Sequence, residues 1–100
     1  MVKHVILWKL KDEFSESEKE EIKKNIKNGL EGLADKIPGL SEIHVYTNGL
    51  ASSTADLMLD SQFENEEALR GYSVHPNHVH VADTFVRPYT AVRSCLDFEI

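Results

Sequence analysis

The sequence predicts an α+β fold in which two helical regions cover one face of a four-stranded antiparallel sheet. Segments with the period-2 alternation of strands and segments with the 3.6-residue period of helices follow in the order strand, helix, strand, strand, helix, strand. That order is the βαββαβ pattern of a ferredoxin-like protomer. A chain of 100 residues, 41% of them hydrophobic, builds one core, so we expect a single domain over residues 1–100.

The first strand and the long helix are marked by composition and by a cap. Residues 3–10 are rich in β-branched and aromatic side chains, which favours a strand. Ser15 and Ser17 each stand three residues before a glutamate, the capping-box spacing, so a helix begins there. Its apolar residues recur in steps of three or four as far as the break at Pro38-Gly39. They are Ile22, Ile26, Leu30, Leu33 and Ile37.

Two strands are predicted in the middle of the chain. Residues 40–47 alternate apolar and polar side chains, and residues 55–63 place Leu57, Leu59 and Phe63 on one parity. A turn at Asn48-Gly49 and a small polar loop are expected to join the two strands.

A second helical region and a last strand complete the pattern. Asn65 is expected to cap a short helix that Pro76 interrupts. Residues 77–86 then have apolar side chains at helical spacing, and an Arg-Pro dipeptide forces the chain to extend. Residues 91–100 form the last strand.

The sheet is predicted to be apolar on both faces. Val5 and Leu7 lie on one parity of the first strand, and Ile6 and Trp8 lie on the other. A sheet with one solvated face would be polar at every second position. We therefore expect a homodimer in which the two sheets stack face to face, with Val5 and Leu7 in the interface.

Composition excludes several classes of partner. Acidic residues outnumber basic ones by 17 to 11, and the formal net charge of −6 repels nucleic acid and anionic lipid, so no nucleic acid and no membrane surface is expected. The sequence lacks both an apolar run of the roughly 20 residues that a membrane-spanning helix needs and a signal-peptide pattern at its start. The only cysteine, Cys95, is interpreted as an inert core residue. We expect a cytoplasmic location.

Five stretches of the chain carry a family resemblance, and the segment with the pattern Tyr-x-x-His-Pro-x-His is the most specific. The stretches are Val2-Lys3-His4-Val5-Ile6-Leu7, Ile37-Pro38-Gly39, Phe63, Tyr72-Ser73-Val74-His75-Pro76-Asn77-His78-Val79 and Asp97-Phe98. On these residues the chain resembles the stress-responsive A/B barrel (Dabb) domain family along nearly its whole length. The resemblance implies a ferredoxin-like protomer that pairs into a dimeric α/β barrel, and most members have no established activity.

The resemblance also implies a candidate site. In a plant cyclase of this family a histidine acts as base and a tyrosine assists, and the matching residues here are His78 and Tyr72, with His4 and His75 also shared. The proposed fold brings the first strand and the second helical region together between sheet and helices. A histidine titrates near neutral pH, so His78 suits proton removal while Tyr72 donates a hydrogen bond to an oxyanion. Ile6, Trp8, Leu57 and Leu59 are the expected lining of this pocket.

Structural alternatives stay open for several of these side chains. His75 precedes Pro76 at a helix break, where its ring can bond backbone groups that are left unpaired. His75, His78, His80 and Asp83 have the composition of a metal site, but on a helix His78 and His80 point to different faces, so no metal is expected.

Charged residues on the strands are expected to pair across strands or across the dimer, or to line a polar barrel that binds a ligand. They are Asp56, Asp60, Arg93 and Asp97.

Two functions follow from the sequence. The first is a stable, stress-associated homodimer with a possible small-molecule pocket. The second is a cofactor-independent cyclase- or lyase-like enzyme that uses His78 and Tyr72 on a small carbonyl compound. The sequence has no glycine-rich phosphate loop, no convincing set of metal ligands and no Ser-His-Asp arrangement, which argues against nucleotide, metal and hydrolase chemistry. No cofactor is expected. A heme- or oxygen-handling barrel follows from fold analogy only.

Overall fold

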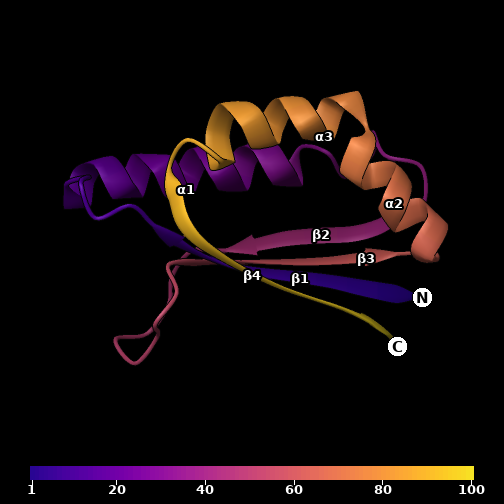
Figure 1. Cartoon of the computed structure of the whole chain (residues 1–100), viewed down its shortest axis with the longest axis horizontal. Coiled ribbons are helices and arrows are strands. Elements are labelled where there is room, and N and C mark those ends of the chain that lie inside the picture. The colour runs from indigo at the N-terminus through magenta and orange to yellow at the C-terminus, as the bar shows by residue number, and fades with distance from the viewer.

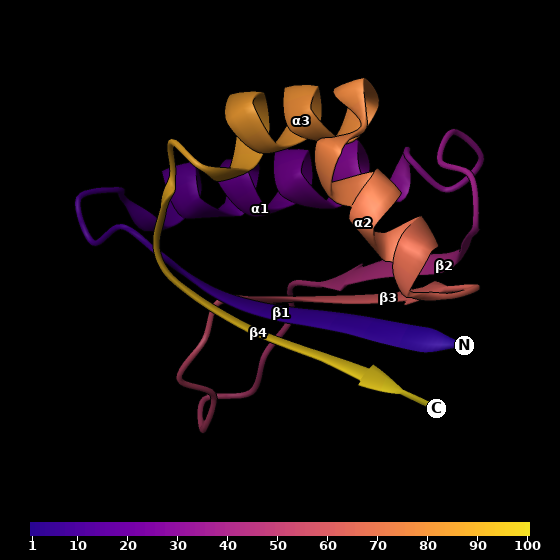
Figure 2. The same ribbon diagram turned by 45° about the vertical axis from the view of Figure 1, so that its right-hand side comes forward.

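The computed structural model describes all of residues 1–100 and confirms the predicted order of elements. The helices lie on one side of the sheet, as both views of the ribbon show (Figures 1 and 2). The elements are β1 Val2–Leu10, α1 Glu16–Glu31, β2 Leu40–Tyr46, β3 Leu57–Phe63, α2 Glu66–Val74, α3 Pro76–Val81, the π-helix η1 Ala82–Val86 and β4 Thr90–Glu99. None of the helices has both the length and the apolar character that crossing a bilayer requires.

The four strands form one antiparallel sheet in the order β2-β3-β1-β4, which confirms the ferredoxin-like topology. β1 lies between β3 and β4, and Ile6 stands opposite Leu59 on one side and Cys95 on the other. Side chains alternate between the two faces of a strand. The even-numbered residues of β1 are therefore buried under the helices, while Leu7 on the opposite face is 43% exposed.

Helix α1 begins as predicted and ends earlier than predicted. Ser15 forms the capping box with Glu18, in which each side chain bonds the other residue's backbone N–H. The helix ends at Glu31, and not at the Pro38-Gly39 break, because Gly32, a poor helix former, caps it and the chain continues as turns. These turns keep Leu33 and Ile37 buried, so the pattern of buried apolar residues continues beyond the end of the helix.

Helix α1 also protects the free edge of β2. The backbone N–H of Val45 donates to Glu31 Oε2 at 2.9 Å, and Lys27 Nζ donates to the Val45 carbonyl oxygen at 2.8 Å. Unpaired backbone groups on an edge strand invite pairing with other chains. The link between Lys27, Glu31 and Val45 satisfies two of these groups and fixes the helix to the sheet.

The second helical region changes its winding at its end. α2 and α3 meet at His75, and Pro76 takes the first position of α3, where its missing N–H is not needed. The predicted helix over residues 77–86 is helical, but its last part is the π-helix η1, in which Arg87 N–H donates to the Ala82 carbonyl oxygen at 2.8 Å. Ala82 and Val86 of η1 are both buried.

The face of the sheet that points away from the helices, here called the outer face, carries exposed apolar side chains. Lys3 and Asp60 form an ion pair of 2.9 Å on the same face. The exposed apolar residues are Leu7, Tyr46, Val92, Leu96 and Phe98. This finding confirms the prediction that both faces of the sheet are apolar.

The connection between β2 and β3 differs from its prediction. Residues 47–50 have no regular structure, and the turn lies at residues 51–52, so it does not fall on Asn48-Gly49. β3 accordingly begins at Leu57 and not at residue 55.

The structure predicts opposite effects for two glycine substitutions. Gly39 has φ of 81°, and a Cβ there would lie 2.5 Å from Ala68 Cβ, so Gly39→Ala should lower the free energy of unfolding by more than about 1 kcal/mol. Gly71 lies inside α2 with nothing within 4 Å of an added Cβ. Gly71→Ala should therefore raise the free energy of unfolding by about 0.5–1 kcal/mol. Urea unfolding measures both, and a Gly39→Ala protein as stable as the wild type would contradict the prediction.

Candidate functional site

A cavity of about 110 Å³ lies between the inner face of the sheet and the second helical region. β1 contributes His4, Ile6 and Trp8, and Leu59 of β3 completes the apolar floor. Leu30 of α1, residues of α2, α3, η1 and β4, and Arg87 directly after η1 supply the rest of the wall, which includes Tyr72, His78 and Arg93. Apolar side chains with a few convergent polar groups are the usual composition of a small-molecule site.

Tyr72 is the most deeply buried polar side chain of this wall. It is 2% exposed, and its ring packs against Phe63 at a centroid distance of 5.0 Å. Its hydroxyl is buried without any hydrogen-bond partner. Burial raises the pKa of Tyr72 far above its usual value, so the phenol keeps its proton at neutral pH. A buried donor without an acceptor is costly, and few are found in folded proteins.

His78 stacks on Tyr72, with the two ring centroids 4.1 Å apart. His78 Nδ1 lies 3.4 Å from the carbonyl oxygen of Ser73. Because a carbonyl only accepts hydrogen bonds, this contact places the proton on Nδ1 and leaves Nε2 with a free lone pair. Burial lowers the pKa of His78, the hydrogen bond to Ser73 opposes this effect, and the positive charges of Arg87 and Arg93 lower the pKa further. The net shift is downward, so the ring is neutral at neutral pH.

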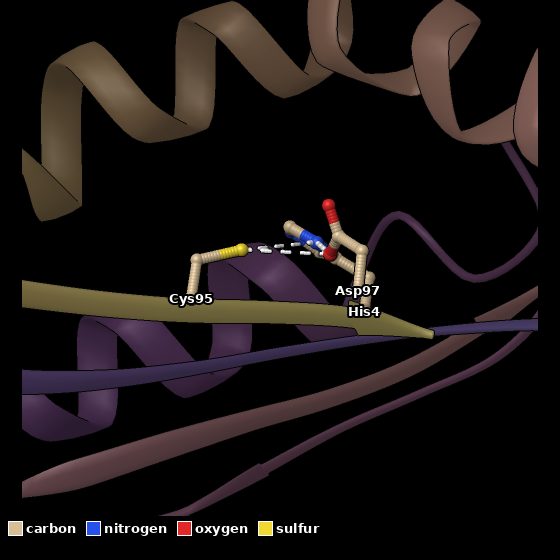
Figure 3. Close-up of side chains that lie close together, drawn as sticks. All are labelled: His4, Cys95 and Asp97. Carbon is tan, nitrogen blue, oxygen red and sulfur yellow. Dashed lines mark hydrogen bonds and ion pairs between the residues drawn. The ribbon is translucent and has the colours of Figure 1, made fainter. Parts of the chain in front are cut away.

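His4 is held by a carboxylate from the neighbouring strand. Its Nδ1 lies 2.5 Å from Asp97 Oδ1, and the two residues face each other across β1 and β4 (Figure 3). The Nδ1–H group donates to the carboxylate, which fixes the orientation of the imidazole. The ring also contacts Tyr72 edge-on, with centroids 6.0 Å apart. Asp97 therefore pairs across strands, one of the arrangements that the sequence left open.

Cys95 is not the core residue that the sequence predicted. It is exposed, because it lies on the edge strand β4, where the helices do not cover the inner face. Its Sγ–H group donates to Asp97 Oδ1 at 3.4 Å. Burial by its neighbours and the adjacent Asp97 carboxylate both raise the pKa of the thiol, so it is not an activated thiolate.

The ligand atoms of His4, Cys95 and Asp97 lie within 4.8 Å of one another, the spacing of a metal site (Figure 3). Two ligands of a tetrahedral zinc ion would be about 3.3 Å apart. The 2.5 Å separation of His4 Nδ1 and Asp97 Oδ1 is that of a hydrogen bond, so the three side chains are arranged as a hydrogen-bonded cluster.

Two of the predicted site residues lie outside the cavity. His75 Nδ1 accepts from the backbone N–H of Asn77 at 3.1 Å, so this histidine caps α3, the structural role left open above. Leu57 is buried in the core but does not line the cavity. His80 is exposed on α3, and Asp83 forms an ion pair with Arg87, so neither joins His78 in a metal site.

Arg87, Arg93 and Thr90 are wall residues that the sequence analysis did not assign to the pocket. The register of the sheet places Arg93 opposite Trp8, on the inner face. The shared parity of Arg93 and Asp97 indicated a common face, but only the pairing of β4 with β1 shows that this face borders the cavity.

Comparisons with known proteins agree with this geometry. The model of the Stress responsive A/B Barrel Domain matches residues 2–100. The olivetolic acid cyclase of Cannabis sativa is 30% identical over 87 residues, which are 84% of this chain and 82% of that protein.

Solved structures of other proteins have the same fold. A dimeric protein of unknown function from Bacteroides fragilis is 31% identical, with a TM-score of 0.92 over 99% of this chain and 95% of that one. A dimeric ferredoxin-like protein of unknown function from Thermobifida fusca is 22% identical, with a TM-score of 0.78 over 99% of this chain and 90% of that one, a likeness that shows the fold alone.

The lowered pKa of His78 predicts how stability depends on pH. Below about pH 6.5 the unfolded chain binds a proton at this histidine while the folded protein does not, so the free energy of unfolding falls as the pH falls toward the lowered pKa. His78→Gln should weaken this dependence in urea unfolding between about pH 7.5 and pH 5.5. His80→Gln, at an exposed site on the same helix, is the control and should keep the wild-type slope. Equal slopes for the wild type and His78→Gln would contradict the prediction.

Proposed function

Because this chain belongs to the stress responsive A/B barrel domain family, we propose that residues 1–100 form one domain that works as a homodimer and binds a small carbonyl compound in the cavity of each protomer. The observation that carries this proposal is the buried Tyr72 hydroxyl, which has no partner within the protein. A cytoplasmic location stays a prediction from the sequence.

The unpartnered hydroxyl supports a ligand that carries an acceptor oxygen. Leaving a buried donor unsatisfied costs about 1–3 kcal/mol, and a carbonyl oxygen in the cavity would remove that cost. The volume sets the size of the ligand. An engineered cavity of about 150 Å³ holds benzene, so a cavity of about 110 Å³ encloses roughly four or five non-hydrogen atoms.

A second candidate function, proton transfer on the bound carbonyl compound, is favoured by the state of His78. Nε2 of the neutral ring takes a proton from the carbon next to the carbonyl group. The electron pair of the broken C–H bond forms a C=C bond, and the π pair of the carbonyl group moves to its oxygen, which gives an enolate. The Tyr72 hydroxyl donates a hydrogen bond to that oxygen. Return of the proton from Nε2 restores the neutral histidine, so the step needs no cofactor. The similarity to a protein named as a cyclase supports this candidate.

The outer face supports the homodimer. Leu7, Leu96 and Phe98 are exposed in the single protomer on the face that the helices leave uncovered. Stacking two such faces removes both apolar surfaces from water at once, which is an isologous arrangement. The Bacteroides fragilis and Thermobifida fusca structures are described as dimeric, which supports the same assembly for this chain.

Substitution of Leu7 tests the dimer. Leu7→Asp places a charge in the proposed interface, so light scattering should show monomer, or aggregate, where the wild type shows a dimer. Val74→Asp is the matched control because Val74 is 76% exposed at the end of α2, away from the outer face, and it should leave the dimer intact. A dimeric Leu7→Asp protein would refute the assigned interface.

The roles of Tyr72 and His78 are tested together with acetone as the probe. In D₂O the wild type should speed the exchange of the acetone methyl protons, measured by NMR. His78→Gln should lower the exchange rate by about 10²–10⁴-fold and Tyr72→Phe by about 10²–10³-fold, while His80→Gln should have no effect. Tyr72→Phe should also unfold at an equal or higher temperature, because it removes an unsatisfied hydroxyl. A wild type that does not speed the exchange would exclude the proton-transfer candidate.

A further inference from the structure

The two side chains of the cavity wall that always carry a charge, Arg87 and Arg93, are both positive. Arg87, Arg93, His4 and His78 line the cavity, and none of the chain's 17 carboxylate side chains does. This contrasts with a protein whose formal net charge is −6. A wall of basic groups in an acidic protein creates a local field that favours an anion.

Within this wall Arg93 is the one cation without an internal counter-charge. Arg87 forms an ion pair with Asp83, and His4 is bound to Asp97. Arg93 takes part in none of the ion pairs of the chain. It lies on β4 at the exposed side of the cavity, so its guanidinium stays hydrated while it faces the wall.

The charge of Arg93 reaches both proposed reactive groups. Burial raises the pKa of Tyr72, and Arg93 opposes that rise. Burial also lowers the pKa of His78, and Arg93 lowers it further. Both effects require that the guanidinium lie within electrostatic reach of the two rings, because the interaction of charges falls with distance.

We propose that the ligand of this cavity is a small carboxylate with a neighbouring carbonyl group, of the 2-oxo acid class, whose carboxylate binds Arg93 while its carbonyl oxygen accepts from Tyr72. The inference rests on the proposed small-molecule site and adds the charge of the ligand. A guanidinium and a carboxylate match as two planar groups with parallel hydrogen bonds. The enclosed volume holds the carbonyl part of such a molecule, and its carboxylate lies at the exposed side, where the cost of desolvation is small.

The experiment compares a charged probe with a neutral one of the same shape. Titration calorimetry near pH 7.5 with pyruvate and with pyruvamide should give at least a tenfold tighter binding of pyruvate to the wild type. Arg93→Gln should abolish that preference, and Arg93→Lys, which keeps the charge without the planar fork, should keep part of it. Arg70→Gln is the matched control, because Arg70 is an exposed arginine on α2 outside the cavity wall, and it should bind as the wild type does. Thermal unfolding of each variant checks that it is folded.

The outcomes separate this inference from the proposed function. If pyruvamide binds as tightly as pyruvate, the proposed small-molecule site is supported, but the proposal that its ligand carries a carboxylate is refuted. If neither probe binds the wild type, the small-molecule site itself fails and the inference fails with it. Inorganic phosphate serves as a third probe, and phosphate binding as tight as that of pyruvate would show a general anion site and overturn the assignment to a carboxylate. A preference that survives Arg93→Gln would remove Arg93 from the site.

Discussion

The rest of the structure depends on one constraint: the side chains of β1, a central strand of the sheet, alternate between its two faces. β1 pairs with both β3 and β4, so its register sets the face on which every residue of those strands lies. Its even positions put His4, Ile6 and Trp8 under the helices, and its odd positions put Leu7 on the outer face. A slip by one residue would exchange the two sets and move His4, Ile6 and Trp8 out of the cavity.

The two edge strands of the sheet differ in how the helices cover them, and the cavity lies beside the less covered strand, β4. On β2 the free edge is bonded to α1 through Glu31 and Lys27. On β4 no helix covers the inner face, and nine of its ten residues are exposed. The second helical region spans the sheet only as far as η1, so the space beside β4 is lined by Arg93 on the strand and by Tyr72 and His78 above it. The site therefore lies where the core is incomplete.

Tyr72 combines a stabilising contact with a destabilising one. Its ring packs against Phe63 in the core, which stabilises the fold, while its hydroxyl is buried without a partner, which destabilises it. A phenylalanine would provide the packing without the cost. Buried polar atoms without a hydrogen-bond partner are typical of functional sites, where a ligand can supply the missing partner.

The sequence alone determined the order of elements, the ferredoxin-like topology, the capping box of α1 and the two apolar faces of the sheet, because these depend on local spacing and on parity. It also marked His4, Tyr72 and His78 through a family resemblance. The end of α1, the π-helix η1, the capping role of His75 and the exposure of Cys95 were decided only by the tertiary structure. They depend on which elements cover which part of the sheet. The inclusion of Arg93 in the cavity wall was decided in the same way, because its neighbours on β1 and in the helices are far away in the sequence.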